Sequence, residues 1–109
     1  MAIYANLIID QGSDFVTEIQ VASATGDDAD LTGYTFAAQL RKTYASTTNT
    51  AFTCSVVNAS KGIIKIELSN AQTLALKAGR YVYDVEATLS GVITRIVEGQ
   101  VTVTPGVTQ

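Results

Sequence analysis

The chain has 109 residues, a formal net charge of −3, no histidine, no tryptophan and one cysteine. This length suits a single domain, residues 1–109, and a hydrophobic share of 47% is enough to build a core. The missing histidine removes the usual general base, and the single cysteine excludes an internal disulfide or a multi-cysteine zinc site. Composition therefore predicts a protein that is not an enzyme and binds no cofactor.

The charge also limits the partners. A pI near 4.6 argues against nucleic acid, because nucleic-acid-binding domains usually carry a basic patch. The seven basic residues are scattered, and we expect the longest basic run, Arg41-Lys42, at a solvated strand end rather than on a phosphate. The sequence shows neither a signal-peptide pattern nor an apolar run of about 18–20 residues. We expect synthesis in the cytoplasm and no membrane partner.

Apolar and polar residues alternate with a period of two along most of the chain, as in strands that have one core face and one wet face. The pattern predicts seven strands, at residues 3–9, 14–22, 34–42, 51–58, 63–69, 80–89 and 92–104. Turn-forming residues separate the strands, and the most specific signals are the hairpins at Ser60-Lys61-Gly62 and Ser90-Gly91.

One segment departs from this pattern. Ser69 and Gln72 have the spacing of a helix capping box, and Lys77 and Gly79 suit the end of a helix. We expect one or two helical turns here, crossing from one sheet to the other. The whole chain is therefore predicted to be all-β: an immunoglobulin-like antiparallel β-sandwich of about seven strands with one short helical crossover.

Two acidic groups are candidate sites. Asp27, Asp28 and Asp30 could supply oxygen ligands to a cation, but a solvated turn is the favoured interpretation because aspartate is common in turns. Asp84 and Glu86 lie two residues apart and project from the same face of their strand. Paired carboxylates can hydrolyse glycosides within a cleft, but we favour surface pairing with a cation from another strand. The candidate cations are Arg80, Lys65 and Arg95.

The remaining reactive side chains suggest structural roles. Cys54 falls on the apolar side of its strand, where we expect a small buried hydrophobic residue. Without histidine, serine cannot form the usual triad; the serines considered are Ser13, Ser69 and Ser90. Three tyrosines are expected in the core: Tyr34, Tyr81 and Tyr83. Two are freer, Tyr4 and Tyr44, and Tyr44 together with Arg41 could contribute to a contact surface. No catalytic, cofactor-binding or metal-binding residue is assigned.

Several stretches in this order resemble small structural proteins of tailed bacteriophages. They are IDQGSDF at 9–15, LTGY at 31–34, QLRK at 39–42, AGRYVYDV at 78–85 and RIVEGQVTV at 95–103. The order is also similar to the immunoglobulin-like N-terminal domain of phage baseplate upper proteins, and the similarity runs over residues 8–108. The resemblance implies a virion component that is present in many copies.

The function expected from this resemblance is a structural component of a phage virion, in the tail, baseplate or neck. Its partners would be other virion proteins and copies of itself, with no small-molecule substrate. One alternative is a capsid decoration (cement) protein. A second is a free-standing carbohydrate-binding β-sandwich module, which would need exposed aromatic residues, although only 7% of the residues are aromatic.

Overall fold

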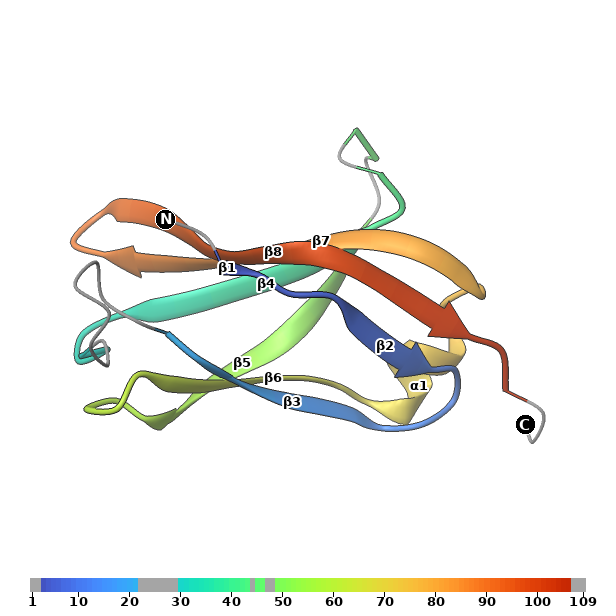
Figure 1. Ribbon diagram of the computed structural model, residues 1–109, viewed down its shortest axis with the longest axis horizontal. Helices are drawn as coiled ribbons and strands as arrows, with labels where there is room; N and C mark the ends of the chain where they lie inside the picture. Colours follow the sequence, from blue (N-terminus) through green and yellow to red (C-terminus); the bar gives the residue numbers. More distant parts are fainter. Residues whose placement is uncertain (1–2, 22–29, 44, 47–48, 107–109) are drawn as a thin grey trace.

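The computed structural model describes residues 3–21, 30–43, 45–46 and 49–106 (Figure 1). Its elements are β1 (Ile3–Tyr4), β2 (Leu7–Asp10), β3 (Phe15–Gln20), β4 (Thr35–Arg41), β5 (Thr50–Asn58), β6 (Ile63–Leu68), α1 (Asn70–Leu74), β7 (Gly79–Leu89) and β8 (Val92–Thr104). Within these described ranges, no helix is long and apolar enough to cross a membrane. The all-β fold class is confirmed.

The strands form because their apolar side chains alternate, so each strand can turn one face inward. In β6, for example, Ile64, Ile66 and Leu68 are buried, while Lys65 and Glu67 point to the surface. The main core cluster is drawn from both layers. Its fully or nearly fully buried members are Ile9, Val21, Leu31, Ala38, Leu40, Phe52, Ile64, Ile66, Leu68, Leu76, Tyr83, Val85, Val97, Val101 and Val103.

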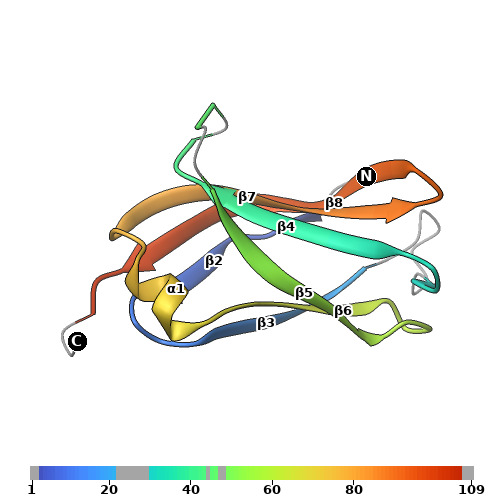
Figure 2. The same ribbon diagram turned by 180° about the vertical axis from the view of Figure 1, so that it is seen from behind.

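The strands form a continuous sheet that folds over into two layers, nearly a barrel. The order is β1-β8-β7-β4-β5-β6-β3, and β2 also pairs with β8. β5 belongs to both layers, because Ala51 and Phe52 pair with β4 whereas Thr53 to Asn58 pair with β6. It closes one side of the sandwich (Figure 2), and β2 and β3 border the opposite, open side (Figure 1).

The expectation of a purely antiparallel sandwich is wrong at one edge. β1 and β2 both run parallel to β8, with Ile3 opposite Val97 and Ile9 opposite Val103. The expected first strand, residues 3–9, is also broken at Ala5 and Asn6 into two pieces. Alternation of side chains records which face is buried but not the direction of the neighbouring strand, so the sequence pattern could not reveal the parallel pairing.

The helical crossover is confirmed in kind but is shorter than its sequence signals suggest. The capping box is present: the Ser69 hydroxyl accepts from the Gln72 backbone N–H, and the Gln72 side chain accepts from the Ser69 backbone N–H. α1 ends at Leu74 with Ala75 as its C-cap, so Lys77 lies beyond the helix. Gly79, expected at the helix end, instead begins β7 with φ of 142°.

Candidate functional site

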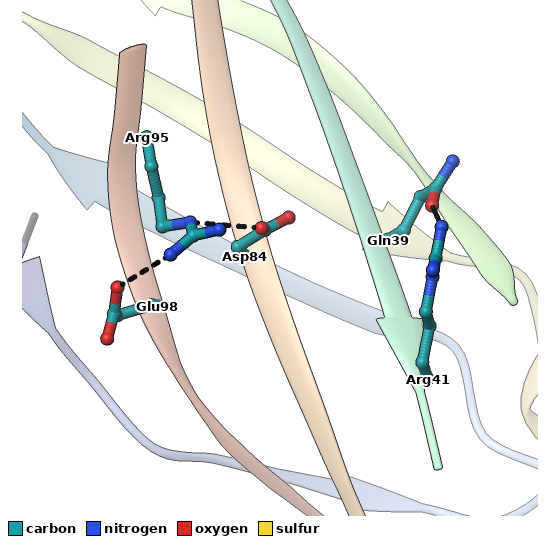
Figure 3. A network of polar contacts seen from close by, with 5 residues as sticks. All are labelled: Gln39, Arg41, Asp84, Arg95 and Glu98. Carbon is teal, nitrogen blue, oxygen red and sulfur yellow. Dashed lines mark hydrogen bonds and ion pairs between the residues drawn. The ribbon is translucent and has the colours of Figure 1, made fainter. Parts of the chain in front are cut away.

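The outer surface of the layer formed by β4, β7 and β8 carries the main cluster of charged side chains. We call it the polar face and define it by Gln39, Arg41, Arg80, Val82, Asp84, Glu86, Arg95 and Glu98. Asp84 and Glu86 lie on it together, as predicted from their spacing, because side chains two apart in a strand share a face. Figure 3 shows five of its residues on three neighbouring strands.

A β-bulge in β8 brings Arg95 to this face. Val85 pairs with Val97, but Glu86 pairs with Arg95, so Ile96 is an extra residue on β8. Without the bulge, Arg95 would share the inward face of Val97, since the two are two residues apart. The extra residue reverses the alternation: Arg95 turns outward to the carboxylates, while Ile96 packs against the core.

Arg95 bridges two carboxylates. Its Nε lies 3.1 Å from Asp84 Oδ2, and its Nη1 lies 3.4 Å from Glu98 Oε2 (Figure 3). The nearby Asp84 charge, together with the Glu98 contact, raises the pKa of the Arg95 guanidinium above its usual value. Surface pairing of Asp84 with Arg95 is therefore confirmed. The other cations considered lie elsewhere: Lys65 pairs with Glu67 in the opposite layer, and Arg80 stands opposite Thr102.

Arg41 extends the polar face across β4. Its Nη2 donates to Gln39 Oε1 at 3.2 Å (Figure 3), and its Nη1 donates to the Ser46 carbonyl at 3.2 Å. An open hollow of about 210 Å³ is lined by Arg41 and Arg95 together with Val82, Tyr83, Asp84 and Glu86. More of its lining surface is polar than apolar, so it suits charged or hydrogen-bonding groups of a partner.

The acidic loop is described only at Asp30. Asp27 and Asp28 lie outside the described residues. Asp30 Oδ1 accepts hydrogen bonds from both the backbone N–H and the hydroxyl of Thr32, and these bonds lower the pKa of Asp30. Such a contact two residues ahead is the Asx turn that aspartate commonly forms. Within the described ranges, no group of three potential ligands could hold a metal ion.

Cys54 and the serines take structural positions. Cys54 is half-buried rather than fully buried; it packs against the core, and desolvation raises the pKa of its thiol. Ser69 caps α1, and the Ser13 carbonyl accepts from the hydroxyl of buried Thr73. Ser90 occupies the predicted hairpin turn with φ of 50°, beside Gly91 with φ of 81°. Positive φ at both positions is the signature of a type I′ turn.

The tyrosines divide differently from the prediction. Tyr83 is buried, as expected, and its burial raises the pKa of the phenol to about 12. Tyr34 stacks against Phe36 and Tyr81 lies beneath the Lys42 ammonium, but both are only half-buried. Tyr4 is 62% exposed, and Tyr44 lies outside the described residues. Tyr4 stands opposite Glu98, next to the polar face.

The sequence patterns did not reveal how the N-terminal strands are attached. At the break between β1 and β2, the Ala5 carbonyl accepts from the Tyr83 hydroxyl at 2.6 Å, and Asn6 Oδ1 accepts from the Gln100 N–H at 3.0 Å. The Ala5 peptide lies directly against Gly99, where any Cβ would overlap it. The available signal was a glycine inside a strand, which often marks a close approach of another backbone.

No protein-family model matches the chain, and no curated protein matches it. Among solved structures, InlP of Listeria monocytogenes matches at 15% identity with a TM-score of 0.51, over 94% of this chain and 28% of that one. A family 123 glycoside hydrolase from Clostridium perfringens matches at 12% identity with a TM-score of 0.42, over 97% of this chain and 24% of the enzyme. The chain thus spans about a quarter of the length of these proteins, and the first likeness concerns the fold alone.

Proposed function

We propose that this chain is a structural component of a tailed-bacteriophage virion, in the tail, baseplate or neck, where it acts as a protein–protein assembly module. The assignment to a virion is supported by the order of sequence stretches that resemble phage structural proteins. The assembly role is supported by one structural observation: two unpaired strand edges border the same open side of the sandwich.

Both edges present backbone groups for pairing. The Val21 N–H bonds to the Gly62 carbonyl, so alternate residues of β3 bond to β6, and Val16 and Glu18 direct their backbone groups away from β6. The Gln11 N–H likewise bonds to the Thr104 carbonyl, which leaves the backbone groups of Ile8 directed away from β8. A strand from a neighbouring subunit could add to either edge.

Each of these edges exposes one large apolar side chain beside charged ones. Ile8 is 68% exposed and Val16 is 55% exposed, while Asp10 and Glu18 are exposed next to them. Proteins protect open edges with lysine or other charges, with proline, with short strands or with a covering element. Among the described residues of β2 and β3, no lysine or proline is present, and the charges are the carboxylates of Asp10 and Glu18. The exposed apolar side chains of Ile8 and Val16 beside open edges support a module that adds to other subunits.

The test is incorporation into particles of the phage that encodes the chain. Mass spectrometry of purified virions should detect it in many copies, and electron microscopy should locate it in the tail, baseplate or neck. Ile8→Lys should reduce incorporation because it places a charge on the edge, whereas Ser60→Lys, at an exposed position of the β5–β6 turn, should not. Location on the capsid exterior would favour a decoration protein instead, and absence from the virion would contradict the proposal.

A further inference from the structure

Two charged side chains of the polar face lack a partner. Among the described residues, neither Arg80 nor Glu86 takes part in an ion pair or a side-chain hydrogen bond. Both project outward from β7, which pairs with β4 without irregularity from Val82 to Thr88. They are six residues apart, about 20 Å at 3.3–3.4 Å per residue, so they cannot pair within one copy.

Charge is also segregated along this face. Arg41 stands opposite Val82, so the cations Arg41 and Arg80 occupy the half nearest the start of β7. The carboxylates of Asp84, Glu86 and Glu98 occupy the other half, where Arg95 is engaged by Asp84 and Glu98. The face therefore has a positive half and a negative half, and Val82, an apolar residue, lies between them.

We propose that the polar face is the contact surface between two copies of this chain, related by a two-fold axis near residue 83. Residue 83 is halfway between positions 80 and 86, so a two-fold rotation about this axis places Arg80 of each copy opposite Glu86 of the other. The Arg80–Glu86 contact therefore forms twice, as in an isologous interface. The inference deepens the proposed assembly function, on which it rests.

The centre of this interface combines an apolar residue with a hollow. Val82 of each copy lies one residue from the axis and faces Asp84 of the other copy, beside the hollow of about 210 Å³ in the polar face. Arg80 and Glu86 lie farther from the axis, where charged residues set register and orientation more than affinity. Arg80 of one copy then faces Glu86 of the other, which lines this hollow together with Arg95.

A second copy fits this face better than a nucleic acid does. The chain carries a net charge of −3, and three carboxylates lie on the face itself, so a phosphate backbone would be repelled. A partner must instead present carboxylates and cations in the reverse order along about 20 Å. An antiparallel copy of the same face does this by symmetry.

Sedimentation equilibrium of the full chain, at low and high salt, tests the proposal. The wild type should approach twice the 11.5 kDa monomer mass as concentration rises, and high salt should weaken the association. Arg80→Glu and Glu86→Lys should each weaken it at least about tenfold, because each places like charges opposite one another. The double variant Arg80→Glu/Glu86→Lys restores opposite charges and should associate within about threefold of the wild type.

Lys61→Glu is the matched control, because Lys61 lies in the exposed β5–β6 turn, and it should associate as the wild type does. A wild type that stays monomeric at every concentration overturns the inference but not the virion role, which is tested separately in purified particles. The inference is also overturned if neither single charge reversal weakens self-association, or if the double variant does not recover the association of the wild type. Binding of an oligonucleotide that requires Arg80 would reassign the face to a polyanion and overturn it as well.

Discussion

Replacing Gly99 with alanine should detach the N-terminal strands from the rest of the sandwich. Gly99 lies inside β8 opposite Tyr83, and a Cβ at this position would lie 2.7 Å from the carbonyl carbon of Ala5 and overlap its oxygen. The neighbour is backbone rather than a flexible side chain, so the Ala5 peptide must move away. That movement disrupts the two hydrogen bonds that attach the segment between β1 and β2: the bond from the Tyr83 hydroxyl to Ala5 and the bond from the Gln100 N–H to Asn6.

The cost follows from those bonds. Moving the Ala5 carbonyl leaves the buried Tyr83 hydroxyl without its acceptor, which costs about 1–3 kcal/mol. Loss of the bond from the Gln100 N–H to Asn6 Oδ1 adds about 0.5–1.5 kcal/mol. We therefore expect Gly99→Ala to lower the free energy of unfolding by about 1.5–4.5 kcal/mol.

Two measurements check this result. Denaturant unfolding, followed by circular dichroism, gives the free energy of unfolding. Spectrophotometric titration follows Tyr83, whose pKa of about 12 should fall in the variant because the protonated hydroxyl loses its bond to the Ala5 carbonyl. Gly91→Ala is the control: Gly91 has φ of 81° with open space around it, so alanine should cost about 1 kcal/mol through backbone strain and leave Tyr83 unchanged. A Gly99→Ala protein with wild-type stability and wild-type titration would refute the reasoning.

Three further predictions concern stability. Tyr83 keeps its proton in the folded chain up to a pH of about 12, whereas in the unfolded chain it loses the proton near pH 10. Its ionisation should therefore leave the free energy of unfolding unchanged below pH 10 and lower it by about 2–3 kcal/mol as the pH rises to 12. Tyr83→Phe should abolish this decline, and an unchanged pH profile would contradict the assignment. Ser69→Ala removes the N-cap of α1 and should cost about 1 kcal/mol in urea unfolding, whereas Ser55→Ala, on an exposed strand position, should cost less than about 0.5 kcal/mol. Ile66→Ala should cost about 2–5 kcal/mol because Ile66 is fully buried, and Ile93→Ala, at a position 62% exposed, should change stability by less than about 0.5 kcal/mol; equal effects of these two would show that the core is wrongly placed.

The strands and turns were predictable because they depend on local sequence. Alternation in residues 63–69 marked Ile64 and Ile66 as buried, and Ser90-Gly91 specified a turn with two positive φ angles. The capping box at Ser69 likewise depends on residues three apart. The end of α1 was misplaced because Lys77 and Gly79 carry helix-ending signals whichever element they enter.

The arrangement of the strands was less predictable from the sequence. The parallel pairing of Ile9 with Val103 depends on how the chain enters the fold, which side-chain alternation does not record. Nor does alternation show that β5 leaves one layer for the other after Phe52. The proximity of Asp84 and Arg95 was predictable from neighbouring strands, but the bulge at Ile96 that aims Arg95 outward was not.

The hollow of the polar face was only partly predictable from the sequence. Asp84 and Glu86 were expected on one face from their spacing, and the structure places both there. Arg41 reaches the same face because β4 pairs with β7, and it is held by the Ser46 carbonyl in the following loop. A bond from a strand residue to a loop carbonyl has no sequence signature, so this part of the site required the structure.

The parallel attachment of β2 to β8 has a consequence for how the chain folds. Ile9 pairs with Val103, 94 residues later, so these partners must find each other across nearly the whole sequence. The β7–β8 hairpin, joined by a two-residue turn, can form as soon as it is synthesised. During translation, Leu7 and Ile9 have no strand partner until β8 has left the ribosome. Their apolar side chains stay exposed in the nascent chain until then.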